Sequence, residues 1–190
     1  MAGLAGWTRR RGALVACTVL WLAGCALGGG KGAESSASVA PQRIAIEARP
    51  NGIAVRTGDG ALFITDDATN SVLVATDQHS FTRYAALPAG GANRSLSQLD
   101  FADPRLLLVA RFGFGTAGAL LGVAGPQQIT TFAGPDPVRR RLGLAVIAPG
   151  KVLSTWFVKR DDQPANAPPS AGLSVLMYDT TTGGAVERDL

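Results

Sequence analysis

The residues that most often carry enzyme chemistry are scarce in this sequence of 190 residues. It contains two cysteines, Cys17 and Cys25, and one histidine, His79. We expect Cys17 to be removed with an amino-terminal leader, so the mature chain can form neither an internal disulfide nor a thiolate zinc site. His79 falls in an expected turn, without an acid-base partner that the sequence can place. We interpret it as a surface residue.

An excess of positive charge is also missing from the expected mature chain. The formal net charge is +4, with 18 basic and 14 acidic residues, but Arg9, Arg10 and Arg11 lie in the leader. Without these three the balance is 15 against 14, or +1. Such a balance does not indicate a nucleic-acid surface, and we expect no nucleic-acid partner.

The apolar run at residues 13–23 is too short to span a bilayer. It holds eleven apolar or small residues after three arginines, whereas a membrane-spanning helix needs about 20. A run of this length suits the central region of a secretory signal. Residues 1–24 are therefore predicted to be a signal peptide.

Leu22-Ala23-Gly24-Cys25 closes this run and resembles the bacterial lipobox. The resemblance implies cleavage before Cys25, acylation of that cysteine, and a lipid-anchored place in the bacterial cell envelope. Ala26 follows, and a residue other than Asp there implies the outer membrane, facing the periplasm. Leu14-Val15-Ala16-Cys17 also fits the box but leaves almost no apolar segment before the cut. An ordinary signal peptide with an incidental Cys25 stays open.

Residues 25–42 are expected to form a flexible tether. Residues 26–42 are rich in glycine, alanine and serine and have almost no large apolar side chains. A segment of this kind buries too little surface to offset the entropy lost on ordering. The folded domain is therefore expected at residues 43–190.

That domain begins with short β-favouring runs closed by Gly, Asp, Asn and Thr. The first four lie at residues 53–55, 62–64, 72–74 and 81–84. No helix fits between breakers this close together, so the runs predict a four-stranded antiparallel meander. Gly58-Asp59-Gly60 supplies the positive φ angles that its first hairpin turn needs.

The meander recurs along the chain. Ile53, Leu99 and Leu144 each belong to a strand pair and are 46 and 45 residues apart. A period of about 45 residues with four short strands is typical of propeller blades. The predicted fold is all-β, a partial β-propeller, with a β-sandwich as the alternative. The three blades are expected at about residues 43–87, 88–134 and 135–190.

The motifs PNGIAV, Gly-Asp-Gly, ALFITD and VLVATD resemble a blade of the senescence-marker-protein and gluconolactonase group and of the related NHL-repeat propellers. ARFGFGTAGALLGV and LGLAVIAPGKVLSTWFVK agree more loosely, and the resemblance covers about residues 43–190. It implies that Asn51 is a metal ligand through its side-chain carbonyl. Calcium or another divalent cation held there can polarise a lactone carbonyl or activate water.

One amide cannot hold such an ion alone. Alignment of the repeats puts Ser97 and Leu142 at the positions that match Asn51, and neither is a carboxylate. Glu47 is the only glutamate near the first strand, without a matching motif around it. The chain departs from the enzyme pattern here, so no catalytic residue and no established cofactor is assigned.

Residues 113–118 read G-x-G-x-x-G after a predicted strand, with Asp136 at a plausible distance for a dinucleotide site. That motif needs a helix next, to aim its amino terminus at a pyrophosphate. Gly122, Gly125 and Pro126 break the chain too soon for one. We interpret the motif as a glycine-rich hairpin turn and expect no cofactor there.

Three further features have two interpretations each. Arg139-Arg140-Arg141 either holds an anionic ligand at a propeller face or forms a solvated loop, the commoner case. Trp156 and Phe157 are predicted to pack between blades rather than to form a sugar platform. Residues 161–172 predict a solvated loop on one rim, with a lid as the minor alternative.

Three blades leave two sheet faces open, because a closed propeller has about four to eight. We expect the front part of a longer protein, or else two chains that assemble as three plus three blades. Two functions remain. The first is a lipid-anchored extracytoplasmic binding or scaffold module that contacts a small molecule or a protein. The second is a metal-dependent lactone hydrolase, so whether the protein is an enzyme stays open.

Cys25→Ser is expected to abolish incorporation of labelled palmitate, because it removes the only thiol that the cleaved chain keeps. Gel fluorography of cells grown with the label measures this. Cys17→Ser is the matched control and is expected to label like the wild type. Undiminished labelling of Cys25→Ser would contradict the lipid anchor.

Overall fold

The computed structural model describes residues 46–75, 77, 80–90, 95–113, 118–158, 166 and 170–190. Cys25, His79 and the middle of the G-x-G-x-x-G motif lie outside the described residues, as does most of the 161–172 segment. The chain divides into two units, Met1–Pro41 and Gln42–Leu190.

The described residues form twelve strands and no helix. Accordingly, none of these residues belongs to a helix long and apolar enough to cross a membrane. The strands are β1 (Pro50–Val55), β2 (Leu62–Asp66), β3 (Ser71–Ala75), β4 (Phe81–Ala86), β5 (Leu96–Asp103), β6 (Leu106–Arg111), β7 (Ala119–Gly125), β8 (Gln128–Thr131), β9 (Arg140–Ala148), β10 (Lys151–Val158), β11 (Ser170–Asp179) and β12 (Gly184–Asp189).

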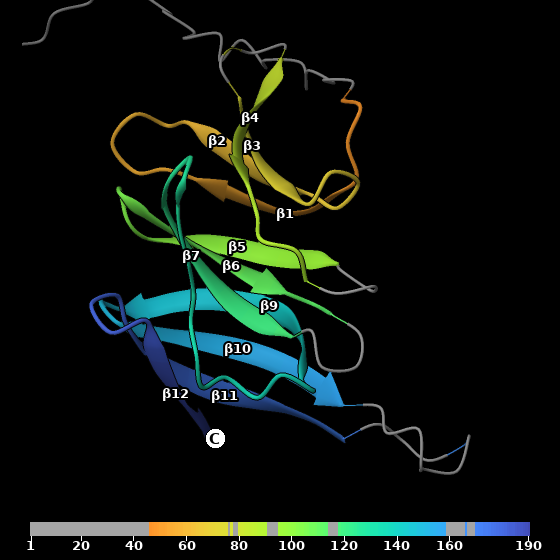
Figure 1. Ribbon diagram of the computed structural model, residues 1–190, viewed down its shortest axis with the longest axis vertical. Coiled ribbons are helices and arrows are strands. Elements are labelled where there is room, and N and C mark those ends of the chain that lie inside the picture. The colour runs from red at the N-terminus through yellow and green to blue at the C-terminus, as the bar shows by residue number, and fades with distance from the viewer. Residues whose placement is uncertain are drawn as a thin grey trace, which may run out of the picture. The chain divides into compact units, whose positions relative to one another are not determined.

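These strands make three antiparallel four-stranded sheets, which follow one another along the chain (Figure 1). Sheet A is β1-β2-β3-β4, sheet B is β5-β6-β7-β8, and sheet C is β9-β10-β11-β12. The all-β prediction and the predicted four-stranded meanders are confirmed. The first hairpin turn also has the predicted conformation, since Gly58 and Gly60 have φ angles of 113° and 70°.

All three sheets carry the same irregularity between their first two strands. Three steps along the first strand match two steps along the second, which is a β-bulge with one extra residue. The pairs that flank it are Pro50–Asp66 and Ile53–Ile64 in sheet A, Leu96–Arg111 and Leu99–Val109 in sheet B, and Arg141–Trp156 and Leu144–Ser154 in sheet C. The register therefore makes Ile53, Leu99 and Leu144 equivalent, which confirms the alignment of the repeats.

The sheets pack through their faces, with their first strands beside one another. Strand β5 lies between β1 and β9 (Figure 1), and sheet B is covered on both faces. Alternate residues of a strand point to opposite faces, so Val109 contributes to the core shared with sheet A and Leu108 to the core shared with sheet C. Both are fully buried. This is why β6 is a continuous apolar run from Leu106 to Ala110.

A hydroxyl group joins the first strands of sheets A and B. Strands β1 and β5 are edge strands of their own sheets, so one side of each backbone lacks ladder partners. Thr65 Oγ1 accepts a hydrogen bond from Gly52 N at 2.9 Å and donates to Ser97 O at 3.2 Å. A Cβ atom on Gly52 would lie 2.5 Å from that carbonyl oxygen, so the close approach requires glycine. Thr65 of β2 thus ties β1 to β5.

Sheets B and C are joined in a similar way. Ser97 Oγ lies 2.7 Å from Arg141 O and 3.1 Å from Ala110 O, so its proton bonds strand carbonyls of β9 and β6. Further along β5, Asp100 Oδ2 accepts a bond from Val146 N at 2.8 Å. Side chains of β5 therefore supply partners to the exposed backbone edge of β9.

A buried ion pair joins the two edge strands of sheet C, β9 and β12. Arg141 on β9 and Glu187 on β12 form two N–O contacts of 2.8 and 2.9 Å, and their side chains are 0% and 6% exposed. Glu187 also accepts bonds from Ser174 Oγ at 2.8 Å and from Asp136 N at 2.9 Å. Arg139 adds a contact of 2.8 Å to the same carboxylate. The segment that leads from sheet B into β9 is thereby fixed to β12.

Glu187→Gln is expected to lower the free energy of unfolding at pH 7 by about 3–5 kcal/mol, since it leaves Arg141 buried without its counter-charge. Burial alone would raise the pKa of Glu187, but bonds from Arg141, the Asp136 amide and Ser174 outweigh it and lower the pKa from 4.5 to about 2. The unfolded state therefore binds the proton more readily than the folded state. The stabilisation is present above pH 4.5 and is lost as the pH falls toward 2.

Urea unfolding followed between pH 7 and 2 measures this difference. Glu47→Gln is the control, because Glu47 is exposed and is expected to change the free energy of unfolding by less than about 0.5 kcal/mol. If the wild type and Glu187→Gln lost stability in parallel over this pH range, the assigned role of Glu187 would be wrong.

Candidate functional site

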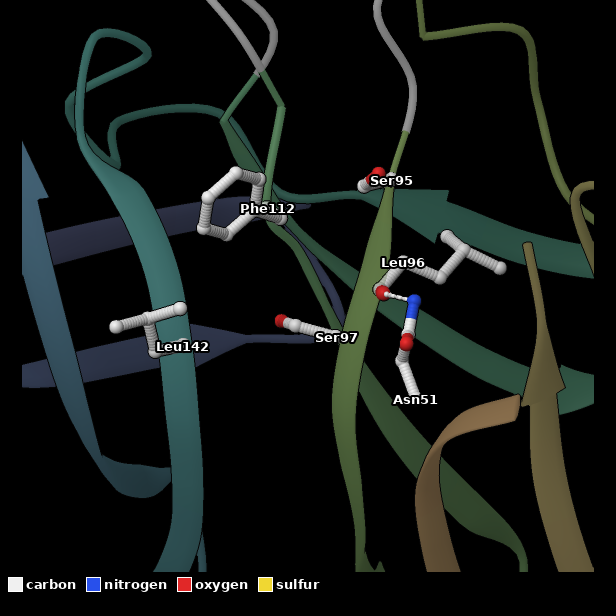
Figure 2. Close-up of a pocket in the computed structure, with 6 residues that line it drawn as sticks. All are labelled: Asn51, Ser95, Leu96, Ser97, Phe112 and Leu142. Carbon is white, nitrogen blue, oxygen red and sulfur yellow. Dashed lines mark hydrogen bonds between the residues drawn. The ribbon is translucent and has the colours of Figure 1, made fainter. Parts of the chain in front are cut away.

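Three equivalent residues of the first strands meet at one pocket. The register places Asn51, Ser97 and Leu142 at the same position in β1, β5 and β9, directly after the residue where each bulge begins. All three line a pocket of about 340 Å³ (Figure 2). Figure 2 shows Ser97 between Asn51 on one side and Leu142 on the other. The alignment made from the sequence therefore corresponds to a real juxtaposition.

The remaining described lining residues come from the ends of β5 and β6. They are Ser95, Leu96 and Phe112. Phe112 N donates to Ser95 O at 2.7 Å, so the two residues continue the pairing of the strands. Neither was predicted from the sequence. The signal that would have found them is the pairing of Leu96 with Arg111, which puts the residues just outside each strand end side by side.

Asn51 presents an acceptor to this pocket. Its Nδ2 donates to Leu96 O at 3.0 Å, which uses the donor half of the amide inside the protein and fixes its orientation (Figure 2). Among the described residues, no donor bonds its Oδ1. The carbonyl half of the amide is therefore available to a ligand that carries an O–H or N–H group.

The two serines offer a ligand fewer hydrogen-bonding groups than Asn51 does. Ser97 directs its proton to the carbonyls of Ala110 and Arg141, so toward the pocket it has only a lone pair. Ser95 Oγ is 3.3 Å from Asp67 Oδ2, and the other oxygen of Asp67 accepts a bond from Leu96 N at 2.9 Å. Asp67 thus holds the start of β5 in place. Asp67 is the only described base that contacts either hydroxyl, and its other oxygen already holds the Leu96 amide.

The described lining residues do not fit a calcium ion by themselves. They supply one amide and two hydroxyls and no carboxylate, whereas calcium takes about six to eight oxygen ligands. The part of the chain that the structure describes contains no group of three or more His, Cys, Asp or Glu side chains that could hold a metal ion. Glu47 is exposed ahead of β1 and is not among those lining residues. The metal role of Asn51 stays a prediction.

A second pocket, of about 460 Å³, lies at the other ends of the strands, where hairpins of sheets B and C meet. Its lining includes Asp103, Tyr178 and Asp179. Both carboxylates already serve their own turns. Asp103 Oδ1 accepts from Arg105 N at 2.7 Å, and Asp179 accepts from Thr181 N at 2.8 Å. Each of these carboxylates therefore stabilises its own hairpin turn.

The arginine run is not a solvated loop. Arg140 and Arg141 belong to β9, and Arg141 is fully buried against Glu187. Arg139 pairs with Glu187 and Asp189, and its guanidinium lies 3.8 Å from the ring centre of Trp156. The solvated-loop interpretation was wrong, and two of the acidic partners, Glu187 and Asp189, lie more than 40 residues further along the chain.

Two other sequence interpretations are confirmed, the second of them for Phe157 only. The G-x-G-x-x-G motif lies between β6 and β7, which pair as an antiparallel hairpin from Arg111–Ala119 onward. A strand follows the motif, as the breakers predicted. The Phe157 ring of sheet C lies 5.6 Å from the Phe112 ring of sheet B, so Phe157 packs between sheets.

No protein-family model matches the chain, and neither a curated protein nor a solved structure matches it. The resemblance to the gluconolactonase group therefore stays a prediction that comes from the motifs alone.

Proposed function

We propose that residues 43–190 are a partial β-propeller that binds a small uncharged molecule at the pocket of Asn51, Ser97 and Leu142. A lipid on Cys25 holds this domain at the bacterial envelope, at the end of the 25–42 tether. The proposal takes the three sheets as three blades, with their first strands around a common axis.

The observation that carries the proposal is the meeting of three equivalent positions around one pocket. Ligand pockets are concave, mostly apolar, and have a few placed polar groups, with volumes of about 300–1,000 Å³. Here Phe112, Leu96 and Leu142 supply apolar surface, and the Asn51 carbonyl supplies an oriented acceptor. No described lining residue is charged, which favours an uncharged ligand with at least one hydroxyl or N–H group.

A metal-dependent lactone hydrolase is the second candidate, supported by the motif resemblance and by the side-chain carbonyl of Asn51. It requires carboxylate ligands beyond the described lining residues. A binding module requires nothing further, so we prefer it. A protein partner that inserts an uncharged side chain into the same pocket fits the binding function equally well.

Thermal unfolding of the full-length protein with a panel of neutral sugars and sugar lactones tests the proposal. At least one compound is expected to raise the melting temperature, because a ligand at 100 times its dissociation constant stabilises the native state by about 2.7 kcal/mol. Leu142→Arg is expected to abolish the shift by filling the pocket mouth. Leu142 is 50% exposed, so the variant is expected to fold.

Val138→Arg is the matched control, since Val138 is 40% exposed and is not among the described lining residues. A shift that survives in Leu142→Arg would place the ligand elsewhere. Millimolar calcium is expected to leave the melting temperature unchanged. An increase with calcium would favour the hydrolase over the binding module.

A further inference from the structure

The shared bulge register makes the three sheets equivalent residue by residue. Each face of one sheet can therefore be compared with the corresponding faces of the other two. The face of sheet B that packs on sheet A is apolar and mostly buried. Its residues and their equivalents in sheet A are Leu99 and Ile53, Phe101 and Val55, Leu107 and Leu62, Val109 and Ile64, Leu121 and Leu73, and Val123 and Ala75.

In sheet A these equivalents lie on the outer face, turned away from sheet B. Phe63 packs toward sheet B, so Leu62 and Ile64 on either side of it point the other way. Ile64 is buried, whereas Ile53 and Val55 are 58% and 57% exposed. The outer face of sheet A thus repeats, position by position, a face that sheet B uses to pack on another sheet.

The outer face of sheet C repeats the other face of sheet B, the one that packs on sheet C. In sheet B, Leu108 and Leu120 face sheet C and are fully buried. Their equivalents, Leu153 and Leu173, lie on the outer face of sheet C. Other residues of this outer face are Ala145, Ile147, Val175, Met177 and Val186, of which Ile147 and Val186 are 51% and 55% exposed.

Thr155 repeats the residue that joins sheets A and B. Its Oγ1 accepts a bond from Gly143 N at 2.8 Å, as Thr65 Oγ1 accepts from Gly52 N. Thr65 also donates to β5, but Thr155 is exposed, and within the described ranges no acceptor receives its proton. The Thr155 hydroxyl could therefore donate to a backbone carbonyl of a further first strand placed beside β9.

We infer that the occupant of both faces is a second copy of this chain. The outer face of sheet C in one copy packs on the outer face of sheet A in the other, and the reverse contact forms at the same time. Two copies then close a ring of six sheets, within the range of about four to eight that propellers have. Sheet B separates the two faces within one copy, so the three described sheets cannot pack these faces on each other.

The repeat also predicts which residues touch across this interface. The Phe63 and Phe101 rings lie 5.1 Å apart between sheets A and B. Leu153 is equivalent to Phe63 and Val55 is equivalent to Phe101, so Leu153 of one copy contacts Val55 of the other. By the same equivalence, Thr155 donates to the backbone carbonyl of Asn51 of the second copy.

Native mass spectrometry of the full-length protein released from membranes tests the inference. The wild type is expected at twice the mass of one chain. Val55→Asp and Leu153→Lys are each expected to raise the dissociation constant at least about tenfold, because each buries an unpaired charge in the interface. The double variant Val55→Asp, Leu153→Lys is expected to recover the dimer, since each new acid then meets a new base.

Val138→Asp is the control and is expected to stay dimeric, because Val138 lies on neither outer face. Recovery in the double variant also excludes misfolding as the cause of dissociation in the single variants. A monomeric wild type, an open-ended polymer, or a dimer that both single variants leave intact would overturn the inference. The inference shares only the stacking of the sheets with the proposed function, so the absence of any ligand shift would leave it standing.

Discussion

The structure depends on hydrogen bonds to the backbone groups on the unpaired sides of the three first strands, β1, β5 and β9. An edge strand carries a row of N–H and C=O groups that its own sheet does not use, and leaving them buried and unbonded is costly. Here Thr65 bonds the edge of β5, and Ser97 and Asp100 bond the edge of β9. These side chains allow three separate sheets to stand with their first strands together and their apolar faces in contact.

The candidate site follows from the same constraint. A bulge begins at the same place in every first strand, and the residues that follow there, Asn51, Ser97 and Leu142, line one pocket. Asn51 and Ser97 both bond an adjacent first strand, through Leu96 O and Arg141 O, and Ser97 keeps less hydrogen-bonding capacity for a ligand than Asn51 does. The chemistry of the pocket is therefore set mainly by Asn51 and by apolar surface.

The repeat made most of the fold predictable. Short β-favouring runs and their glycine and aspartate turns located the strands, and the spacing of Ile53, Leu99 and Leu144 gave the correct equivalence between sheets. The partners of Arg141 were not predictable, because Glu187 reaches it from the far edge of the same sheet. Ser95 and Phe112 were missed because they stand just outside strands, where pairing rather than residue type places them.

The most direct measurement of the central claim is a set of nuclear Overhauser contacts between first strands in the full-length protein. The account predicts contacts of the Asn51 side-chain amide protons with Leu96, and of the Gly52 α-protons with Gln98, residues about one repeat apart. It also predicts contacts between Ser97 and Arg141. Strands β1, β5 and β9 that show contacts only within their own sheets would contradict it.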